Sequence, residues 1–384
     1  MKTFTTSLLF FLCSVLCVPH SVNAQTFGSI SFGASTRNYI VKTPTGFIPG
    51  QQRPLVFNLH GYSSNASQQQ FYCAMNAVAD TAGFIVCYPD GINNAWNSGW
   101  TGVYGSGIDD VGFISALIDT LHTLYNIDLS RVYACGMSNG GFQSYRMACE
   151  LENRICAFAS VTGSFTDSVA FYCSPTRPVP IMEIHGTADN TVNYNGGAFY
   201  KGIEETIAFW VNHNQCLTTA DTIDVPNSVL TDSTTAQIIS YTNCEADAQV
   251  VLIKIQDGGH TWPGSPLDLS GLGYGFTSQD INASSAIWNF FNQFSLPTAV
   301  GIQPVVTEPA LLVGPNPFQD ILQLQVSKAS DNLEIHHADG RLVWSARNVL
   351  SGNVSILSRD WPAGMYFVKT KNADQIELKK VIKN

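Results

Sequence analysis

Residues 131–141 read RVYACGMSNGG, a short strand-like stretch that runs into a serine flanked by glycines. Gly136, Ser138 and Gly140 form a G-x-S-x-G element, and residues 136–150 read as a tight turn followed by a helix. Such a turn exposes a serine hydroxyl, and side chains at its glycine positions would collide with the neighbouring strand and helix. The pentapeptide alone is weak evidence, because an ordinary glycine-rich turn can produce it. Its position between a strand and a helix makes Ser138 the candidate nucleophile.

A nucleophilic serine needs a base, and the base needs a carboxylate that orients it. Asp189 follows the strand expected at residues 179–185, and His260 follows the strand expected at residues 249–255. The chain order serine, aspartate, histidine, with each residue on a loop after a strand, is that of an α/β-hydrolase. We therefore predict His260 as the general base and Asp189 as its orienting acid, with Glu183 or Asp257 as the alternative acid.

The remaining histidines have structural interpretations. His122 and His213 fall in helical patterns and are expected to pack or face solvent. His185 ends a strand and is expected to pack beside Asp189. His336 and His337 lie in the C-terminal region and are expected to face solvent.

Two backbone N–H groups should stabilise the oxyanion formed by attack on a carbonyl. One is expected from Asn139, directly after the nucleophile. The other should come from the loop after the strand at residues 53–60, which contains His60, Gly61 and Tyr62, and we favour the N–H of Tyr62. The alternative is that His60 and Gly61 only mark the end of a strand.

Four aromatic residues occur in loops that we expect at the rim of the site: Trp100, Trp262, Tyr62 and Tyr104. Aromatic rings there could stack on a sugar or on an aromatic acyl group, so Trp100 and Trp262 are candidate substrate-binding residues. For Trp100, an anchoring role in loop packing is nearly as good an interpretation.

Neither a metal site nor an organic cofactor is expected. Asp109 and Asp110 could suggest paired carboxylates, but they precede a predicted helix, where acidic residues cap free N–H groups. No C-x-x-C pair supports a zinc or redox site. Cys135 precedes the nucleophile turn within a strand pattern and is expected to be buried and reduced.

Strands alternate with helical patterns between residues 25 and 297. Near-continuous apolar strands are expected at residues 53–60, 83–88, 131–135, 179–185 and 249–255, and helices at residues 110–125 and 284–294. This pattern predicts an α/β-hydrolase whose mostly parallel sheet is covered by helices on both faces.

Both ends of the chain differ from this central region. Residues 1–24 carry Lys2, an apolar run of signal-peptide length and a final small residue, so we predict an export signal and not a membrane span. Residues 298–312 are the expected linker, because they show little periodicity and Pro297, Pro304 and Pro309 lie within or next to them. Residues 313–384 alternate with period two and are expected to form a small all-β sandwich.

The distribution of charge supports a boundary between the central and C-terminal regions, and the net charge bears on which partners the chain can bind. The chain has a net charge of −10, whereas nine Lys/Arg and seven Asp/Glu give residues 313–384 a net of +2. Only 12% of residues are charged. An acidic chain without a basic patch argues against nucleic-acid binding, and no segment after residue 24 is long and apolar enough to span a membrane.

Six motifs occur in the order found in polyhydroxybutyrate depolymerase-like esterases, close to the feruloyl and acetylxylan esterases of carbohydrate esterase family one. They are LHGYSSN (59–65), VADTAGFIVCYPDG (78–91), DDVGFISALIDTL (109–121), RVYACGMSNGG (131–141), RPVPIMEIHGTADNTVNY (177–194) and DGGHTWPG (257–264). The resemblance implies the same catalytic residues, Ser138, Asp189 and His260, and a disulfide between Cys216 and Cys244. Other pairings among the cysteines stay open.

The C-terminal region resembles the type IX secretion sorting domain through residues 314–318 (GPNPF), 339–342 (DGRL), 362–366 (PAGMY) and 379–383 (KKVIK). This resemblance implies recognition by the secretion machinery and a secreted or surface location. Read without the family, the tail is a β-sandwich that could bind a partner.

The sequence thus predicts a secreted serine esterase that acts through an acyl-enzyme on polyester or plant-cell-wall esters, whether hydroxybutyrate, feruloyl or acetyl. Two alternatives remain: a serine peptidase on the same scaffold, and a non-catalytic surface-binding protein with a relic hydrolase fold.

Overall fold

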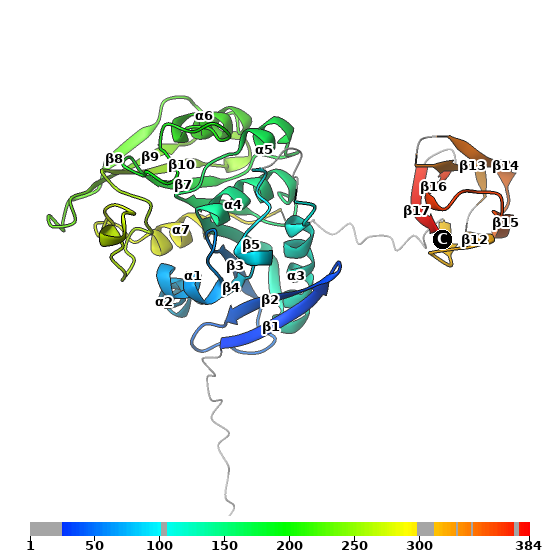
Figure 1. The fold of residues 1–384 in the computed structure, drawn as a ribbon, viewed down its shortest axis with the longest axis horizontal. Helices are drawn as coiled ribbons and strands as arrows, with labels where there is room; N and C mark the ends of the chain where they lie inside the picture. The colour runs from blue at the N-terminus through cyan, green and yellow to red at the C-terminus, as the bar shows by residue number, and fades with distance from the viewer. Residues whose placement is uncertain (1–24, 101–105, 298–310, 328, 339–340, 372–375) are drawn as a thin grey trace, which may run out of the picture. The chain divides into compact units, whose positions relative to one another are not determined.

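The computed structural model describes residues 25–100, 106–297, 311–327, 329–338, 341–371 and 376–384 (Figure 1). The chain divides into two compact units, Met1–Thr298 and Ala299–Asn384. The predicted signal peptide lies outside the described residues, as do residues 298–310 of the predicted linker. Of the helices in the described part of the chain, none has the length and apolar character needed to cross a membrane.

A ten-stranded sheet forms the centre of the first unit, in the order β1-β2-β4-β3-β5-β6-β7-β10-β9-β8. The strands are β1 (Gln25–Phe32), β2 (Ser35–Lys42), β3 (Arg53–Leu59), β4 (Ile85–Pro89), β5 (Ile127–Met137), β6 (Ala157–Val161), β7 (Ile181–Gly186), β8 (Asp221–Asp224), β9 (Thr235–Tyr241) and β10 (Val250–Gln256). The run from β4 to β10 is parallel, and the outer strands on both sides pair antiparallel.

Helices cover both faces of this sheet. They are α1 (Ala66–Cys73), α2 (Met75–Ala82), α3 (Asp110–Tyr125), α4 (Asn139–Glu150), α5 (Asp167–Tyr172), α6 (Ile203–His213) and α7 (Ala283–Phe291). Side chains of successive strand residues pack into hydrophobic cores on opposite faces of the sheet. Leu55 and Phe57 pack in the core with α3, α4 and α6, and Val56 packs in the core with α1, α2 and α7. Alternation of side chains along a strand produces this division. The predicted α/β-hydrolase fold is confirmed.

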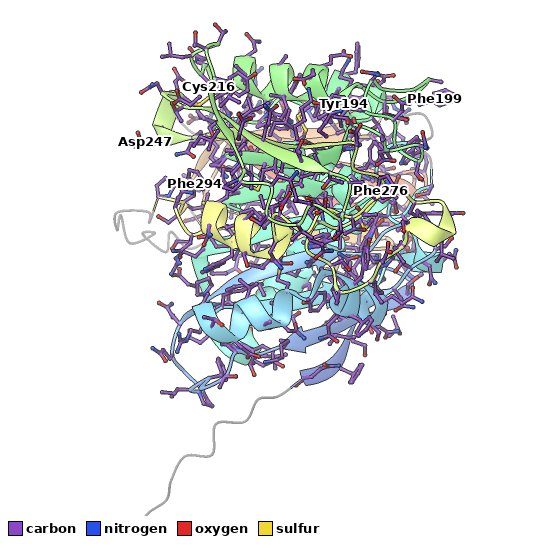
Figure 2. The ribbon with its side chains drawn as sticks, turned by 90° about the vertical axis from the view of Figure 1, so that its left-hand side faces the viewer. Tyr194, Phe199, Cys216, Asp247, Phe276 and Phe294 are labelled. Atoms are coloured by element: carbon purple, nitrogen blue, oxygen red, sulfur yellow. A yellow bond between two sulfur atoms is a disulfide. The ribbon has the colours of Figure 1, made fainter. Side chains whose placement is uncertain are left out.

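Two disulfides join surface segments of this unit. Cys216–Cys244 confirms the pairing that the resemblance implied, and Cys149–Cys173 is a second bridge (Figure 2 labels Cys216). Cys135 is free and buried, as predicted, and so are Cys73, Cys87 and Cys156. Burial raises the pKa of the Cys135 thiol well above its usual range, so this group stays protonated and inert.

The second unit is a sandwich of two antiparallel sheets, β11-β12-β15 and β14-β13-β16-β17. Its strands are β11 (Leu311–Gly314), β12 (Ile321–Val326), β13 (Ser330–His337), β14 (Leu342–Val349), β15 (Gly352–Leu357), β16 (Gly364–Lys371) and β17 (Ile376–Lys383). Leu322 and Leu324 of one sheet share a core with Ile335 and Val368 of the other. The first strand begins at Leu311, two residues inside the segment expected to be linker.

Candidate active site

Ser138 occupies a strained turn between β5 and α4. Its backbone angles are φ 54° and ψ −118°, a conformation that few non-glycine residues adopt. A Cβ on Gly136 would lie 2.5 Å from the carbonyl of Gly140, and a Cβ on Gly140 would lie 2.3 Å from the carbonyl oxygen of Leu59. Both glycines are therefore required by close backbone contacts, as predicted from the motif.

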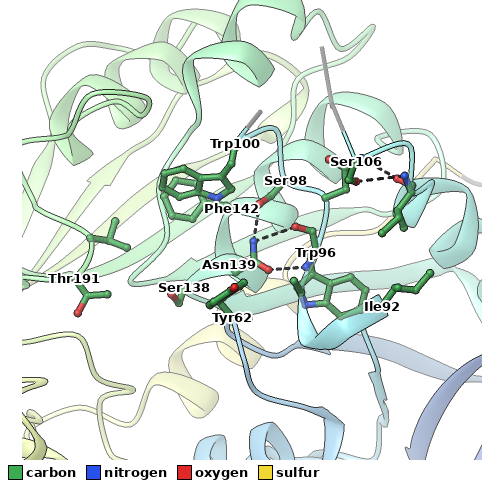
Figure 3. Close-up of a pocket in the computed structure, with 14 residues that line it drawn as sticks. Tyr62, Ile92, Trp96, Ser98, Trp100, Ser106, Ser138, Asn139, Phe142 and Thr191 are labelled. Carbon is green, nitrogen blue, oxygen red and sulfur yellow. Dashed lines mark hydrogen bonds between the residues drawn. The ribbon is translucent and has the colours of Figure 1, made fainter. Parts of the chain in front are cut away.

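Asn139, the next residue, links this turn to the segment at residues 96–98. Its side-chain oxygen accepts a 2.6 Å hydrogen bond from the Trp96 N–H, and its amide nitrogen donates to Ser98 Oγ at 2.8 Å (Figure 3). The side chain of Ser138 does not cap helix α4. The Ser138 side chain therefore does not satisfy any of the free N–H groups in the first turn of this helix.

The His60–Tyr62 segment runs beside Ser138. A Cβ on Gly61 would lie 3.5 Å from Cβ of Ser138. The Gly91 N–H donates to Nε2 of His60 at 2.9 Å, so the proton of this ring resides on Nδ1, which lies 2.7 Å from the carbonyl oxygen of Gly61. Burial lowers the pKa of His60, consistent with a neutral ring. Because the Gly61 carbonyl is held by His60, the following N–H, that of Tyr62, has a fixed direction as well.

Asp189 and His260 are in direct contact. Nδ1 of His260 lies 2.7 Å from Oδ2 of Asp189, and both side chains are buried. The other carboxylate oxygen accepts 2.8 Å hydrogen bonds from the N–H groups of Thr191 and Val192. With Nδ1 donating to the carboxylate, Nε2 of His260 is the nitrogen that can act as a base.

Neither alternative acid takes this place. Glu183 bonds to Tyr145 and His185, and Asp257 is exposed next to Gln256. His185 packs beside Asp189, as expected, with its Nε2 3.4 Å from Oδ2 of Asp189.

The electrostatic environment keeps Asp189 ionised. Burial by itself would raise the pKa of Asp189, but hydrogen bonds and charge from His185 and His260 outweigh it and hold the pKa well below its usual range. For His185, burial by itself would lower the pKa, but Asp189 and Glu183 together raise it to about 9. A charged carboxylate is what an orienting acid in this position requires.

Two cavities meet at Ser138. The first, of about 550 Å³, is lined by apolar and small polar side chains, including Trp96, Trp100 and Phe142 (Figure 3). The second, of about 430 Å³, is lined by His260, Tyr72 and Tyr274 together with a polar group formed by Ser63, Ser64, Gln68 and Gln69. Ser138 and Tyr62 line both cavities.

The structure places the aromatic residues that were expected at the rim in different surroundings. Trp100 is half-exposed, lines the larger cavity and packs its ring 4.7 Å from that of Phe142. The expectation for Trp262 was wrong: its side chain is 1% exposed and lies in the core beside α7. Its indole N–H donates to Ser284 Oγ at 3.2 Å, which allows full burial of this ring. Tyr62 is exposed at the junction of the cavities, and Tyr104 lies outside the described residues.

The other acidic candidates are structural. Asp109 caps α3 by accepting from the Gly112 N–H at 2.7 Å, as predicted. Asp110 is the first residue of α3 and not its cap: it forms a buried ion pair with Arg37 at 2.6 Å and accepts from the Asn97 N–H. The pair anchors the segment that lines the larger cavity.

The histidines outside the site also have local partners. His122 and His213 lie close to the carbonyl oxygens of Ile127 and Arg177, respectively. His336 and His337 are half-buried instead of fully solvent-facing, because Glu334 and the ring of Tyr366 cover them.

Sequence reasoning missed several aromatic residues that line the cavities, among them Trp96, Phe142 and Tyr274. Phe142 lies four residues after Ser138, one helical turn into α4, and this spacing could have indicated that its ring lies near Ser138. Tyr274 lies in a glycine-rich loop without periodicity, and the sequence gives no signal for its contact with His260.

Curated proteins similar in sequence to this chain include esterases. Feruloyl esterase B from Piromyces equi is 29% identical over 273 residues, which cover 68% of this chain and 46% of that protein. A bifunctional acetylxylan esterase/xylanase from Neocallimastix patriciarum is 30% identical over 261 residues, 68% of this chain and 34% of that protein. The chain thus spans less than half the length of either relative.

One solved structure resembles this chain in fold but not in sequence. A protein from Bacteroides ovatus, provisionally assigned as a dipeptidyl aminopeptidase IV, superposes with a TM-score of 0.50 at 11% identity, covering 71% of this chain and 36% of that chain.

Family comparisons identify both units. Residues 38–172 match the family described as esterase PHB depolymerase. Residues 313–384 match the secretion system C-terminal sorting domain, which confirms a secreted or surface location. This chain is therefore similar, over residues 38–172, to the esterase PHB depolymerase family and, over residues 313–384, to the secretion system C-terminal sorting domain.

Proposed function

We propose that this protein is a serine carboxylic-ester hydrolase. Ser138 attacks the ester carbonyl, His260 takes the hydroxyl proton and later gives it to the leaving alcohol, and Asp189 orients the imidazole. Water then hydrolyses the acyl-enzyme by the same route. The observation that carries this proposal is the 2.7 Å contact between His260 and Asp189, with His260 lining the same cavity as Ser138.

The oxyanion is stabilised by the N–H groups of Asn139 and Tyr62. Support comes from the position of Asn139 in the first turn of α4 and from the closeness of Gly61 to Ser138. Preorganised donors of this kind contribute about 3 kcal/mol each to transition-state stabilisation.

The two cavities have different roles. The leaving oxygen must lie next to His260, which donates its proton, so the alcohol occupies the smaller cavity that His260 lines. The acyl group then occupies the larger cavity, on the side of Asn139. Among the described residues that line the two cavities there is no Asp, Glu, Lys or Arg, which favours a neutral ester.

The shape and chemistry of these cavities favour an aromatic acyl group joined to a sugar. Trp96, Trp100 and Phe142 offer ring faces and edges to a planar acyl group such as ferulate, whereas an acetyl group would leave most of the 550 Å³ unfilled. Hydroxyl and amide side chains in the alcohol cavity suit the hydroxyl groups of a sugar.

A substrate panel tests this function. We expect the full chain to hydrolyse methyl ferulate with a higher kcat/KM than p-nitrophenyl acetate, a hydroxybutyrate oligomer or acetylated xylan. Ser138→Ala should lower kcat by about 10⁵-fold or more. Cleavage of a peptide p-nitroanilide without ester hydrolysis would indicate a peptidase. Polymer binding without hydrolysis of any substrate would indicate a binding protein, and either result would refute the proposal.

A further inference from the structure

A second histidine–carboxylate pair lies behind the proposed catalytic acid. Glu183 and His185 occupy alternate positions of β7, so they share one face of the sheet, and both are fully buried. His185 Nδ1 lies 3.0 Å from one oxygen of Glu183, and the Tyr145 hydroxyl donates to the other at 2.7 Å. The pair is therefore linked to α4, the helix that begins directly after the nucleophile.

The surroundings of His185 require a proton on each ring nitrogen. Nδ1 faces the Glu183 carboxylate, and Nε2 faces the Val192 carbonyl at 2.8 Å and the Asp189 carboxylate at 3.4 Å. With both carboxylates ionised, all three partners are hydrogen-bond acceptors. A neutral imidazole carries one N–H and would leave the other nitrogen facing an acceptor, whereas an imidazolium satisfies both.

Charges around the ring agree with a buried cation. Asp189 and Glu183 raise the pKa of His185 to about 9 against the opposing effect of burial. Burial raises the pKa of Glu183, and the hydrogen bond and the charge of His185 oppose that rise. Two groups on neighbouring segments also lie near His185. The centroid of the Tyr194 ring is 6.0 Å from that of the His185 ring (Tyr194 is labelled in Figure 2). Lys254 of β10 is the strand partner of His185, but its ammonium group forms an ion pair with Glu204.

We propose that His185 is a positioning residue whose buried imidazolium holds Asp189 in place and extends activity to lower pH. This inference rests on the proposed function of Asp189 and His260. Oδ2 of Asp189 contacts both rings, so the positive charge of His185 offsets part of the carboxylate charge that would stabilise a protonated His260. Unprotonated His260, the form that acts as base, thereby persists to lower pH.

The double variant Glu183→Gln/His185→Gln tests this role. It removes both charges together, so no buried carboxylate is left without a partner, and both amides can still form hydrogen bonds. We expect the acid limb of the kcat/KM profile to move to higher pH by about one unit. His213→Gln is the matched control, since His213 is the last residue of α6 and its ring contacts the Arg177 carbonyl, away from the site. A double variant whose profile superimposes on those of wild type and the control would overturn the proposal.

A second measurement on the wild-type chain does not depend on catalysis or on folding of the variant. With ¹⁵N-labelled histidine, NMR should show one imidazolium with two protonated nitrogens at pH 8, above the ordinary histidine pKa of about 6.5. If the wild type hydrolyses no ester but shows this signal, the proposed function fails and the buried cation stands. If no imidazolium remains at pH 8, His185 is neutral and the inference is wrong.

Discussion

Nδ1 of His260 lies 2.7 Å from Oδ2 of Asp189, although 71 positions separate the two residues in the chain. Their loops follow β7 and β10, which are parallel neighbours, so both leave the sheet at the same edge. The loops also bond to each other, because the Ala188 N–H donates to the Gly258 carbonyl at 2.9 Å. The strand order brings the two loops to the same edge, and the hydrogen bond between them helps to hold the imidazole beside the carboxylate.

Asp189→Asn should leave the fold intact and lower kcat by about 10⁴-fold, because an amide no longer selects the tautomer with a free Nε2. Initial rates with methyl ferulate measure this effect. Asp257→Asn is the matched control: this carboxylate is exposed and three residues from His260, and its loss should leave kcat unchanged. Equal losses in both variants would show that Asp189 is not the orienting acid.

Gly186→Ala should disturb the contact between the two loops. A Cβ at this position would lie 2.2 Å from the carbonyl oxygen of Gly258, which is backbone and must therefore shift. We expect a loss of about 1–3 kcal/mol in the free energy of unfolding and at least a tenfold loss of kcat/KM, since about 1 Å of misplacement can cost 10²-fold. Urea unfolding and ester hydrolysis measure the two effects. Gly271→Ala, where no atom lies within 4 Å, should change neither.

Much of the fold follows from the sequence pattern. The helix expected at residues 110–125 is α3, and the five apolar strands expected are β3, β4, β5, β7 and β10. The pattern missed β1, β2, β8 and β9 at the sheet edges. Edge strands such as β8 (DTID) expose both faces, so burial does not impose an apolar pattern on them. It also missed β6 (AFASV), which is short and contains small residues.

Within the site, local motifs predicted the nucleophile turn and the candidate acid and base, but not the long-range contacts. Trp262 follows the glycine-flanked His260 and reads as a loop residue, yet its ring packs in the core because α7, distant in sequence, supplies Ser284 as a partner. A signal for the second histidine–carboxylate pair was present: Glu183 and His185 alternate with Met182 and Ile184 in a buried strand. Two titratable groups on one buried face need partners of their own.

Trp100→Ala should lower the preference for aromatic acyl groups. Its ring lines the larger cavity and packs against Phe142, so its removal should lower kcat/KM for methyl ferulate about tenfold relative to p-nitrophenyl acetate. Phe71→Ala is the control, because Phe71 lines the other cavity and should leave this ratio unchanged. If Trp100→Ala leaves the ratio intact and Phe71→Ala lowers it, the assignment of the two cavities must be reversed.

Stability should depend on pH through His185. Its pKa is raised to about 9 in the folded protein, against about 6.5 in an unfolded chain. The stabilisation is therefore fully present below pH 6.5 and is lost as the pH rises through 9. The difference in unfolding free energy between wild type and Glu183→Gln/His185→Gln should fall by about 3 kcal/mol from pH 6 to pH 9.5. Urea unfolding at both values measures it, and a constant or growing difference would contradict a buried imidazolium.

The most direct test of the central claim is the site of covalent labelling by a fluorophosphonate probe, mapped by peptide mass spectrometry. An activated serine in a hydrolase site reacts with such a probe, so the wild-type chain should carry one adduct, on Ser138. Ser138→Ala should carry none, and His260→Ala should label far more slowly. An adduct on another residue, equal labelling of Ser138→Ala, or an unlabelled wild type would contradict the proposed nucleophile.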